Sequence, residues 1–161
     1  MGSQGNHEIV EPLQPYLEPI RKSVVVPRTP AEAFEVFTAR LGSWWPRAQF
    51  SIYQADSATC GIEPHVGGDI FEVSKSGERC VWGSVIAWEP PHRFAMTWHP
   101  GREPETAQEV ELRFIAVADG TRVELEHRGW TKFGTGAAEA REGYEVGWAT
   151  VFDVCFVGAC S

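Results

Sequence analysis

Hydrophobic and polar residues alternate along most of the chain after position 20, in short segments separated by glycine- and proline-containing turns. Alternation with a period of two predicts β-strands that bury one face. The predicted strands are residues 20–26, 59–62, 69–74, 80–88, 93–99, 109–117 and 121–127. The clearest pair is 109–117 and 121–127, because Asp119-Gly120 supplies a tight hairpin turn between them. The pattern therefore predicts an antiparallel sheet built from hairpins.

The side chains predicted to share one face of each strand are mostly large and apolar. They are Trp82, Ser84, Ile86 and Trp88, then Phe94, Met96 and Trp98, then Val110, Leu112, Phe114 and Ala116, and finally Val123, Leu125 and His127. The charged residues between them, including Glu111, Glu124 and Glu126, are interpreted as a solvated face.

Two short helices are expected after the first strand. Thr29 and Glu32 form the T-x-x-E pattern of a capping box, and Pro30 occupies the first helical position. Leu41-Gly42 is interpreted as the end of this helix.

The last stretch, residues 142–158, fits two patterns. At about 100° per residue, one helical face collects Tyr144, Trp148, Val151, Phe152 and Cys155. Alternating apolar residues also fit a strand. The length of the stretch exceeds that of a usual strand, and the preceding sheet needs a helix on one face. We therefore predict a long C-terminal helix.

Composition and charge narrow the class of protein. A chain of 161 residues with 43% hydrophobic content fits one domain, which we place at 20–161, after a proline-containing flexible arm at 1–19. The net charge of −8 argues against nucleic acid as a partner. Neither a signal peptide nor a membrane-spanning stretch is apparent, so a soluble, cytoplasmic protein is expected. We expect it to be a monomer or a homodimer.

Catalytic and metal-binding motifs are not apparent in the sequence. Cys60, Cys80, Cys155 and Cys160 lack the C-x-x-C spacing, and the histidines lack H-E-x-x-H or H-x-H pairing. We therefore predict no metal, no cofactor and no catalytic residue. General acid or base work by His99 or His127 is the lesser alternative to a structural role.

Several motifs, taken in order, resemble the AHSA1-like (activator of Hsp90 ATPase homologue 1-like) branch of the START-like SRPBCC superfamily. They are Val24-Val25-Val26-Pro27 with Ala33-Phe34, Trp44-Trp45-Pro46, Gly67-Gly68, Trp88-Glu89-Pro90-Pro91-His92-Arg93, Trp98, Gly120-Thr121-Arg122-Val123, Gly143-Tyr144 and Gly147-Trp148. The resemblance implies an α+β helix-grip fold, in which a curved antiparallel sheet wraps around a long C-terminal helix and encloses a ligand cavity.

A cavity of this kind points first to a binding module for a hydrophobic or aromatic small molecule. The residues predicted to line it are Trp45, Trp82, Trp98, His127, Trp130, Tyr144, Trp148 and Phe152. His127 or Tyr144 is expected to supply one orienting polar contact. The alternatives are a polyketide cyclase or aromatase and an Hsp90 co-chaperone-like module. A looser resemblance suggests a self-sacrifice resistance protein of enediyne producers, with Gly134, Gly136 or Gly143 as the reacting glycine.

Overall fold

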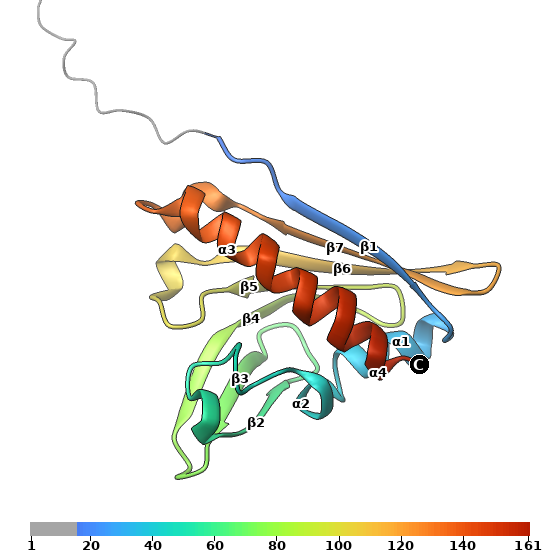
Figure 1. Ribbon diagram of the computed structural model, residues 1–161, viewed down its shortest axis with the longest axis horizontal. Helices are drawn as coiled ribbons and strands as arrows, with labels where there is room; N and C mark the ends of the chain where they lie inside the picture. The colour runs from blue at the N-terminus through green and yellow to red at the C-terminus, as the bar shows by residue number, and fades with distance from the viewer. Residues whose placement is uncertain (1–15) are drawn as a thin grey trace, which may run out of the picture.

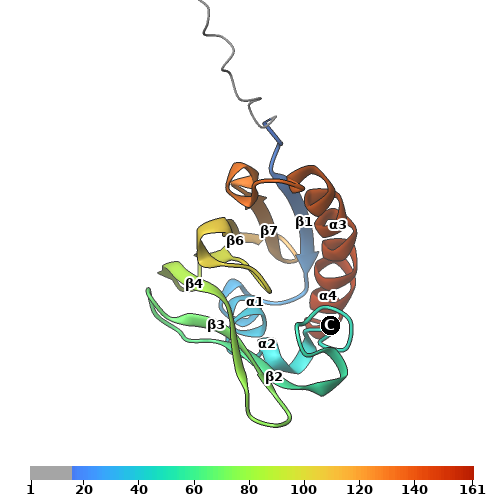
Figure 2. The same cartoon turned by 90° about the vertical axis from the view of Figure 1, so that its left-hand side faces the viewer.

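The computed structural model describes residues 16–161 and contains one curled antiparallel sheet that lies against a long C-terminal helix (Figures 1 and 2). The sheet has seven strands in the order β1-β7-β6-β5-β4-β3-β2. Their bounds are β1 Ile20–Val26, β2 Ser57–Ile62, β3 Asp69–Ser74, β4 Arg79–Glu89, β5 Arg93–Trp98, β6 Gln108–Val117 and β7 Gly120–Arg128. The predicted α+β helix-grip fold is confirmed. The chain's first strand pairs with its last, so β1 closes one edge of the sheet beside the helix.

The predicted alternation holds on most of β5, β6 and β7 and fails on β4, where the pairing is irregular. The residues predicted to face the core on β5, β6 and β7 are buried except Ala116, which is exposed near the hairpin. Val117 pairs with Gly120 at that predicted hairpin.

On β4, the register against β5 shifts between Val85 and Ala87. Ile86, predicted to face the core with Trp82, is the extra residue there and is exposed, whereas its neighbour Val85 is buried. The pairing with β3 likewise skips Trp82. Because each irregularity adds one residue to β4, Trp82, Val85 and Trp88 can all pack towards the core.

The helix after β1 begins as predicted and ends earlier. In α1 (Pro30–Phe37), Thr29 and Glu32 form both hydrogen bonds of the capping box. The predicted end at Leu41-Gly42 is wrong, because Leu41 opens a second short helix, α2 (Leu41–Trp44). Gly42 serves close packing, since a Cβ there would lie 2.7 Å from the carbonyl oxygen of Cys60 on β2.

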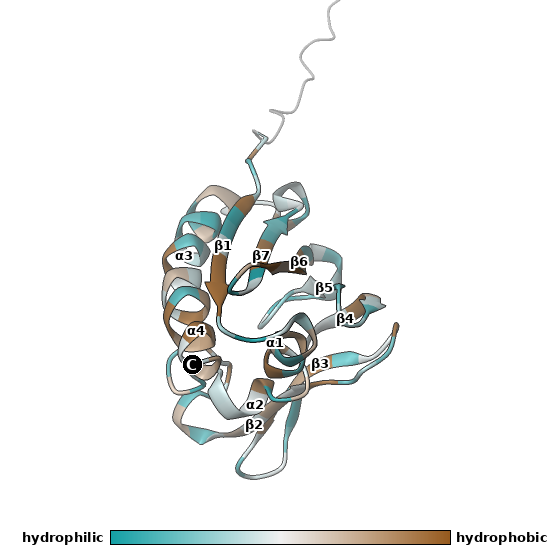
Figure 3. Ribbon diagram, turned by 90° about the vertical axis from the view of Figure 1, so that its right-hand side faces the viewer, coloured by the Kyte–Doolittle hydropathy of each residue, from teal (hydrophilic) through white to brown (hydrophobic). Residues whose placement is uncertain are grey.

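The predicted C-terminal helix is confirmed, and it begins earlier than residue 142. It comprises α3 (Ala137–Thr150), a π-helical segment (Val151–Phe156) and α4 (Val157–Ala159). Gly136, with φ of 87°, adopts the left-handed conformation just before α3. Figure 3 shows hydrophilic residues along the first turns and apolar residues towards α4. The polar first turns explain why hydrophobic periodicity alone did not reveal them.

The predicted N-terminal arm lies mostly outside the described residues. Its end is attached to the helix, because the guanidinium of Arg141 on α3 donates to the carbonyl oxygens of Glu18 and Pro19. Within the described residues, no helix is long and apolar enough to cross a lipid bilayer.

The space between the sheet and the C-terminal helix is filled mainly by aromatic side chains. Phe34 and Phe37 of α1 contact Phe94 of β5, and Phe37 also contacts Phe156 of the π-helical segment. These rings pack together at one end of the core. The aromatic residues nearer the start of α3 pack around a remaining hollow, which is described below.

The outer face of the sheet carries an ion-pair network centred on Glu111. Its side chain is only 3% exposed and pairs with Arg93, Arg113 and Arg128, so its prediction as a solvated residue is wrong. Burial would raise the pKa of Glu111, but hydrogen bonds from the three arginines outweigh burial and lower this pKa to about 2.

We expect Glu111→Gln to lower the free energy of unfolding by about 2 kcal/mol at neutral pH, because three guanidinium groups lose their shared anion. The folded-state pKa of Glu111 is depressed. Its contribution is therefore complete above the ordinary carboxyl pKa and is lost as the pH falls towards 2. Urea unfolding of both proteins across acid pH measures this difference, which should shrink below about pH 4.5. A constant difference over that range would contradict the assignment.

Candidate functional site

A pocket of about 250 Å³ opens between the N-terminal half of the long helix and the loop that precedes β2. The loop contributes one wall, α3 a second, and the end of β5 the floor. The lining consists of Trp45, Gln49, Phe50, Ser51, Ile52, Trp98, Pro100, Tyr144, Gly147, Trp148 and Val151. Most of these side chains are apolar or aromatic. The pocket is therefore suited to a flat, largely apolar ligand.

Three tryptophan rings form the centre of this lining. The ring centroids of Trp45 and Trp98 lie 5.9 Å apart, and each lies 6.0 Å from the centroid of Trp148. Trp45 and Trp148 meet almost perpendicularly, at 87°. This is a favourable edge-to-face arrangement. Each ring is braced by the other two, so the pocket is preformed on this side.

The indole N–H groups of the three tryptophans differ in their hydrogen-bond partners. Trp45 Nε1 donates to the carbonyl oxygen of Phe50 at 2.7 Å, and Trp148 Nε1 donates to His127 Nδ1 at 3.0 Å. Trp98 Nε1 is buried and has no hydrogen-bond partner among the described residues. Because a buried N–H without a partner is costly, Trp98 is the exception that needs an explanation.

His127 lies behind the pocket wall as a neutral, fully hydrogen-bonded residue. Its Nδ1 accepts from Trp148, so Nε2 carries the proton and donates to Gln108 Oε1 at 3.1 Å. Burial, together with the charge of Arg141, lowers the pKa of His127 to about 3. A neutral imidazole with both nitrogens engaged positions Trp148 and has no free site for a ligand.

The eight residues predicted from sequence to line a cavity fall into two groups. Four of them lie in the pocket lining, namely Trp45, Trp98, Tyr144 and Trp148. The other four, Trp82, His127, Trp130 and Phe152, are buried in the core behind it. The ring centroids of Trp130 and His127 lie 4.3 Å apart, and the ring of Phe152 stacks on that of Phe156. Trp130, His127 and Phe152 therefore contribute to core packing.

The loop that forms one wall is held by Glu72 of β3, which sequence analysis did not identify. The carboxylate of Glu72 accepts from the backbone N–H groups of Ile52 and Tyr53 and from Trp82 Nε1, at 2.9 to 3.1 Å. Glu72 is fully buried. A glutamate at an inward position of a predicted strand was the available signal, because a buried carboxylate requires several donors.

The glycines near the pocket also differ in position. Gly147 lies in the lining, between Tyr144 and Trp148, and a Cβ placed on it would contact the Phe50 ring at 3.4 Å. At Gly134 and Gly143 a Cβ would meet no atom within 4 Å. The glycine in the pocket lining is therefore Gly147 rather than one of the three named from sequence.

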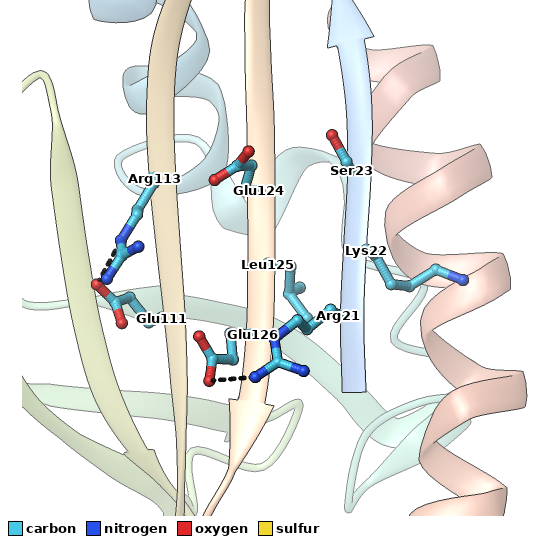
Figure 4. Close-up of a pocket in the computed structure, with 8 residues that line it drawn as sticks. All are labelled: Arg21, Lys22, Ser23, Glu111, Arg113, Glu124, Leu125 and Glu126. Atoms are coloured by element: carbon cyan, nitrogen blue, oxygen red, sulfur yellow. Dashed lines mark hydrogen bonds and ion pairs between the residues drawn. The ribbon is translucent and has the colours of Figure 1, made fainter. Parts of the chain in front are cut away.

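A second hollow, of about 310 Å³, lies over β1, β7 and β6 and has a different character. Figure 4 shows Arg113 paired with Glu111 and Arg21 paired with Glu126, while Lys22 points towards the C-terminal helix. Lys22 pairs there with Asp153 at 3.0 Å. Most charged side chains of this second hollow are paired with one another or with Asp153. The hollow is therefore a poorer ligand site than the aromatic pocket.

A curled sheet gripping a long helix, with an aromatic pocket between them, defines a helix-grip protein. The family described as "Activator of Hsp90 ATPase homolog 1-like protein" matches residues 27–154. The chain belongs to this family.

This chain is similar to solved structures of several other proteins. The anthrahydroquino-γ-pyrone synthase Txn09 is 36% identical, with a TM-score of 0.56, and the match covers 81% of this chain and 88% of that chain. The self-sacrificing resistance protein CalC from Micromonospora echinospora is 26% identical, with a TM-score of 0.62, and the match covers 88% and 92%. An AHSA1-like protein from Aeromonas hydrophila shares the fold at 15% identity, with a TM-score of 0.59 and coverage of 88% and 90%. No curated protein matches significantly.

Proposed function

We propose that the protein binds a polycyclic aromatic small molecule of the polyketide type in the pocket between α3 and the 49–52 loop. The observation that carries this proposal is the lining, in which three mutually braced indole rings meet Phe50 and Tyr144. Flat aromatic ligands gain most from stacked and edge-to-face contacts with such rings. The 36% identity to a synthase of anthrahydroquino-γ-pyrones supports a ligand of that ring class.

The size of the pocket limits how the ligand sits. Its volume of about 250 Å³ is slightly below the range of about 300–1,000 Å³ that is usual for small-molecule sites. The pocket is open to solvent on one side. A ligand of three fused rings would therefore bury one end among the indoles and extend its other end through the opening.

A second candidate function is ring closure on such a molecule, and the identity to Txn09 favours it. The described lining contains one titratable side chain, Tyr144, and no carboxylate or histidine. Proton transfer would therefore have to involve Tyr144, whose pKa is raised by burial. Product analysis by mass spectrometry after incubation with an unclosed aromatic polyketide distinguishes an enzyme from a binding protein.

The proposed binding function predicts that a large side chain at Gly147 fills part of the pocket and weakens binding. We expect Gly147→Leu to weaken binding of 2-(hydroxymethyl)anthraquinone at least tenfold, because the new side chain projects towards Phe50. Quenching of tryptophan fluorescence measures this affinity. Gly143→Leu is the matched control, since it adds the same side chain to α3 at an exposed position where a Cβ would meet nothing within 4 Å.

Both substitutions replace glycine in a helix and should not reduce helix stability. A circular dichroism melt checks that each variant folds. If the wild-type protein does not bind the probe, or if Gly147→Leu binds it as well as Gly143→Leu does, the pocket is not the binding site.

A further inference from the structure

The polar groups of the aromatic pocket are concentrated at one point, where Trp98 meets Tyr144. The indole N–H groups of Trp45 and Trp148 are already donated to protein acceptors. Trp98 is 3% exposed, and its Nε1 has no partner among residues 16–161. The described residues likewise provide no hydrogen-bond partner for the Tyr144 hydroxyl. The Trp98 N–H and the Tyr144 hydroxyl are therefore the two donors among the aromatic lining residues that have no hydrogen-bond acceptor in the described part of the chain.

The two groups are neighbours. Trp98 and Tyr144 line the same pocket, and Trp98 has a small lowering effect on the pKa of Tyr144, although the two groups form no hydrogen bond in the structure. Burial raises the pKa of Tyr144, against smaller opposing effects of Trp98 and Arg102. Tyr144 is therefore a protonated phenol at neutral pH. A small rotation would let Trp98 donate to the Tyr144 oxygen and leave the tyrosine proton free to point into the pocket.

The other polar atoms of the lining do not compete for this role. The Ser51 hydroxyl donates to the carbonyl oxygen of Arg47 at 2.6 Å and accepts from the backbone N–H of Gln54 at 2.9 Å. Gln49 is exposed at the outer rim. A ligand acceptor buried among the indoles thus has Tyr144, supported by Trp98, as its partner.

We infer that the Trp98–Tyr144 pair recognises an acceptor oxygen on the aromatic ligand, such as a ring carbonyl of a quinone or pyrone. This inference rests on the proposed aromatic-binding function and specifies its ligand as an oxygenated ring system. Tyr144 donates its phenolic proton to the ligand oxygen, and the Trp98 N–H donates to the Tyr144 oxygen. The buried N–H thereby gains a partner when the ligand is bound, and neighbouring hydrogen bonds of this kind strengthen one another.

The experiment compares two probes that share a three-ring skeleton and differ in the ring carbonyls. These are 2-(hydroxymethyl)anthraquinone and 2-(hydroxymethyl)anthracene. Wild-type protein should bind the anthraquinone about fivefold to tenfold more tightly, the usual value of one neutral hydrogen bond. Tyr144→Phe should bring this ratio to within about twofold of unity and leave the affinity for the anthracene unchanged. The hydroxyl has no partner in the described chain, so the variant should fold normally.

The results separate the inference from the function on which it rests. If both probes bind the wild type equally, or if Tyr144→Phe keeps the preference for the anthraquinone, the inference is overturned while aromatic binding stands. If neither probe binds the wild type, the proposed function fails and the inference falls with it. Trp98→Phe provides a second measurement and should reduce the preference, because the hydrogen bond that supports Tyr144 is removed.

Discussion

Replacing Trp148 by alanine should lower the free energy of unfolding by about 3–4 kcal/mol. Trp148 is 2% exposed and contacts the rings of Trp45 and Trp98. Truncation also removes the donor to His127, so a buried imidazole nitrogen loses its hydrogen bond. The loss stays below the upper end of the range for tryptophan because part of the ring borders the pocket and has fewer atoms packed against it. Urea unfolding measures the difference.

Trp148→Phe separates the packing of this residue from its hydrogen bond. Phenylalanine retains most of the ring contacts but cannot donate to His127, so we expect a smaller loss of about 1–2 kcal/mol. Ligand affinity should still change, because the ring lines the pocket. Val146→Ala is the control on the same helix, since Val146 is 70% exposed and its truncation should cost less than about 0.5 kcal/mol. An unchanged probe affinity in Trp148→Phe would make Trp148 a core residue only.

Local sequence patterns correctly predicted those helices and turns whose structure depends only on residues close together in the sequence. The capping box of Thr29 and Glu32 needs only four residues, and the β6–β7 hairpin needs only its alternation and Asp119-Gly120. The predictions failed where a residue distant in the sequence determines the local structure. Gly42 resembled a helix end, but its lack of a side chain serves contact with Cys60 on β2. The bulge on β4 depends on pairing with β5, so its effect on Ile86 could not be read from the strand itself.

The pocket was harder to predict than the fold for the same reason. Aromatic residues at inward positions identified Trp45, Trp98, Tyr144 and Trp148, which the fold brings together. Periodicity cannot distinguish a ring that borders a hollow from one buried behind it, as His127 is. The loop wall was missed, because Phe50 and Ile52 belong to no periodic segment.

Glu72→Gln should lower the free energy of unfolding by about 3 kcal/mol and loosen the pocket wall. Glu72 is a buried carboxylate that accepts from the N–H groups of Ile52, Tyr53 and Trp82. An amide offers one acceptor oxygen, and its NH₂ group would face donors. Breaking a buried charged network of this kind is among the costliest single changes. Glu78→Gln removes the same charge from an exposed residue of the β3–β4 turn and is the matched control.

The role of Glu72 as an anchor of the loop is tested by hydrogen exchange and by pH. Burial would raise the pKa of Glu72, but hydrogen bonds to the carboxylate, including those from the backbone N–H groups of Ile52 and Tyr53, outweigh burial and lower the pKa. Stability from this carboxylate is therefore complete above its ordinary pKa of 4.5 and is lost as the pH falls below that value. In Glu72→Gln, amides of residues 49–53 should exchange faster at neutral pH, and probe affinity should fall with them. Below pH 4.5 the wild type should approach the variant in both stability and loop exchange. If loop exchange is unchanged in a folded Glu72→Gln protein, the wall is held by other contacts, and Glu72 contributes to core stability alone.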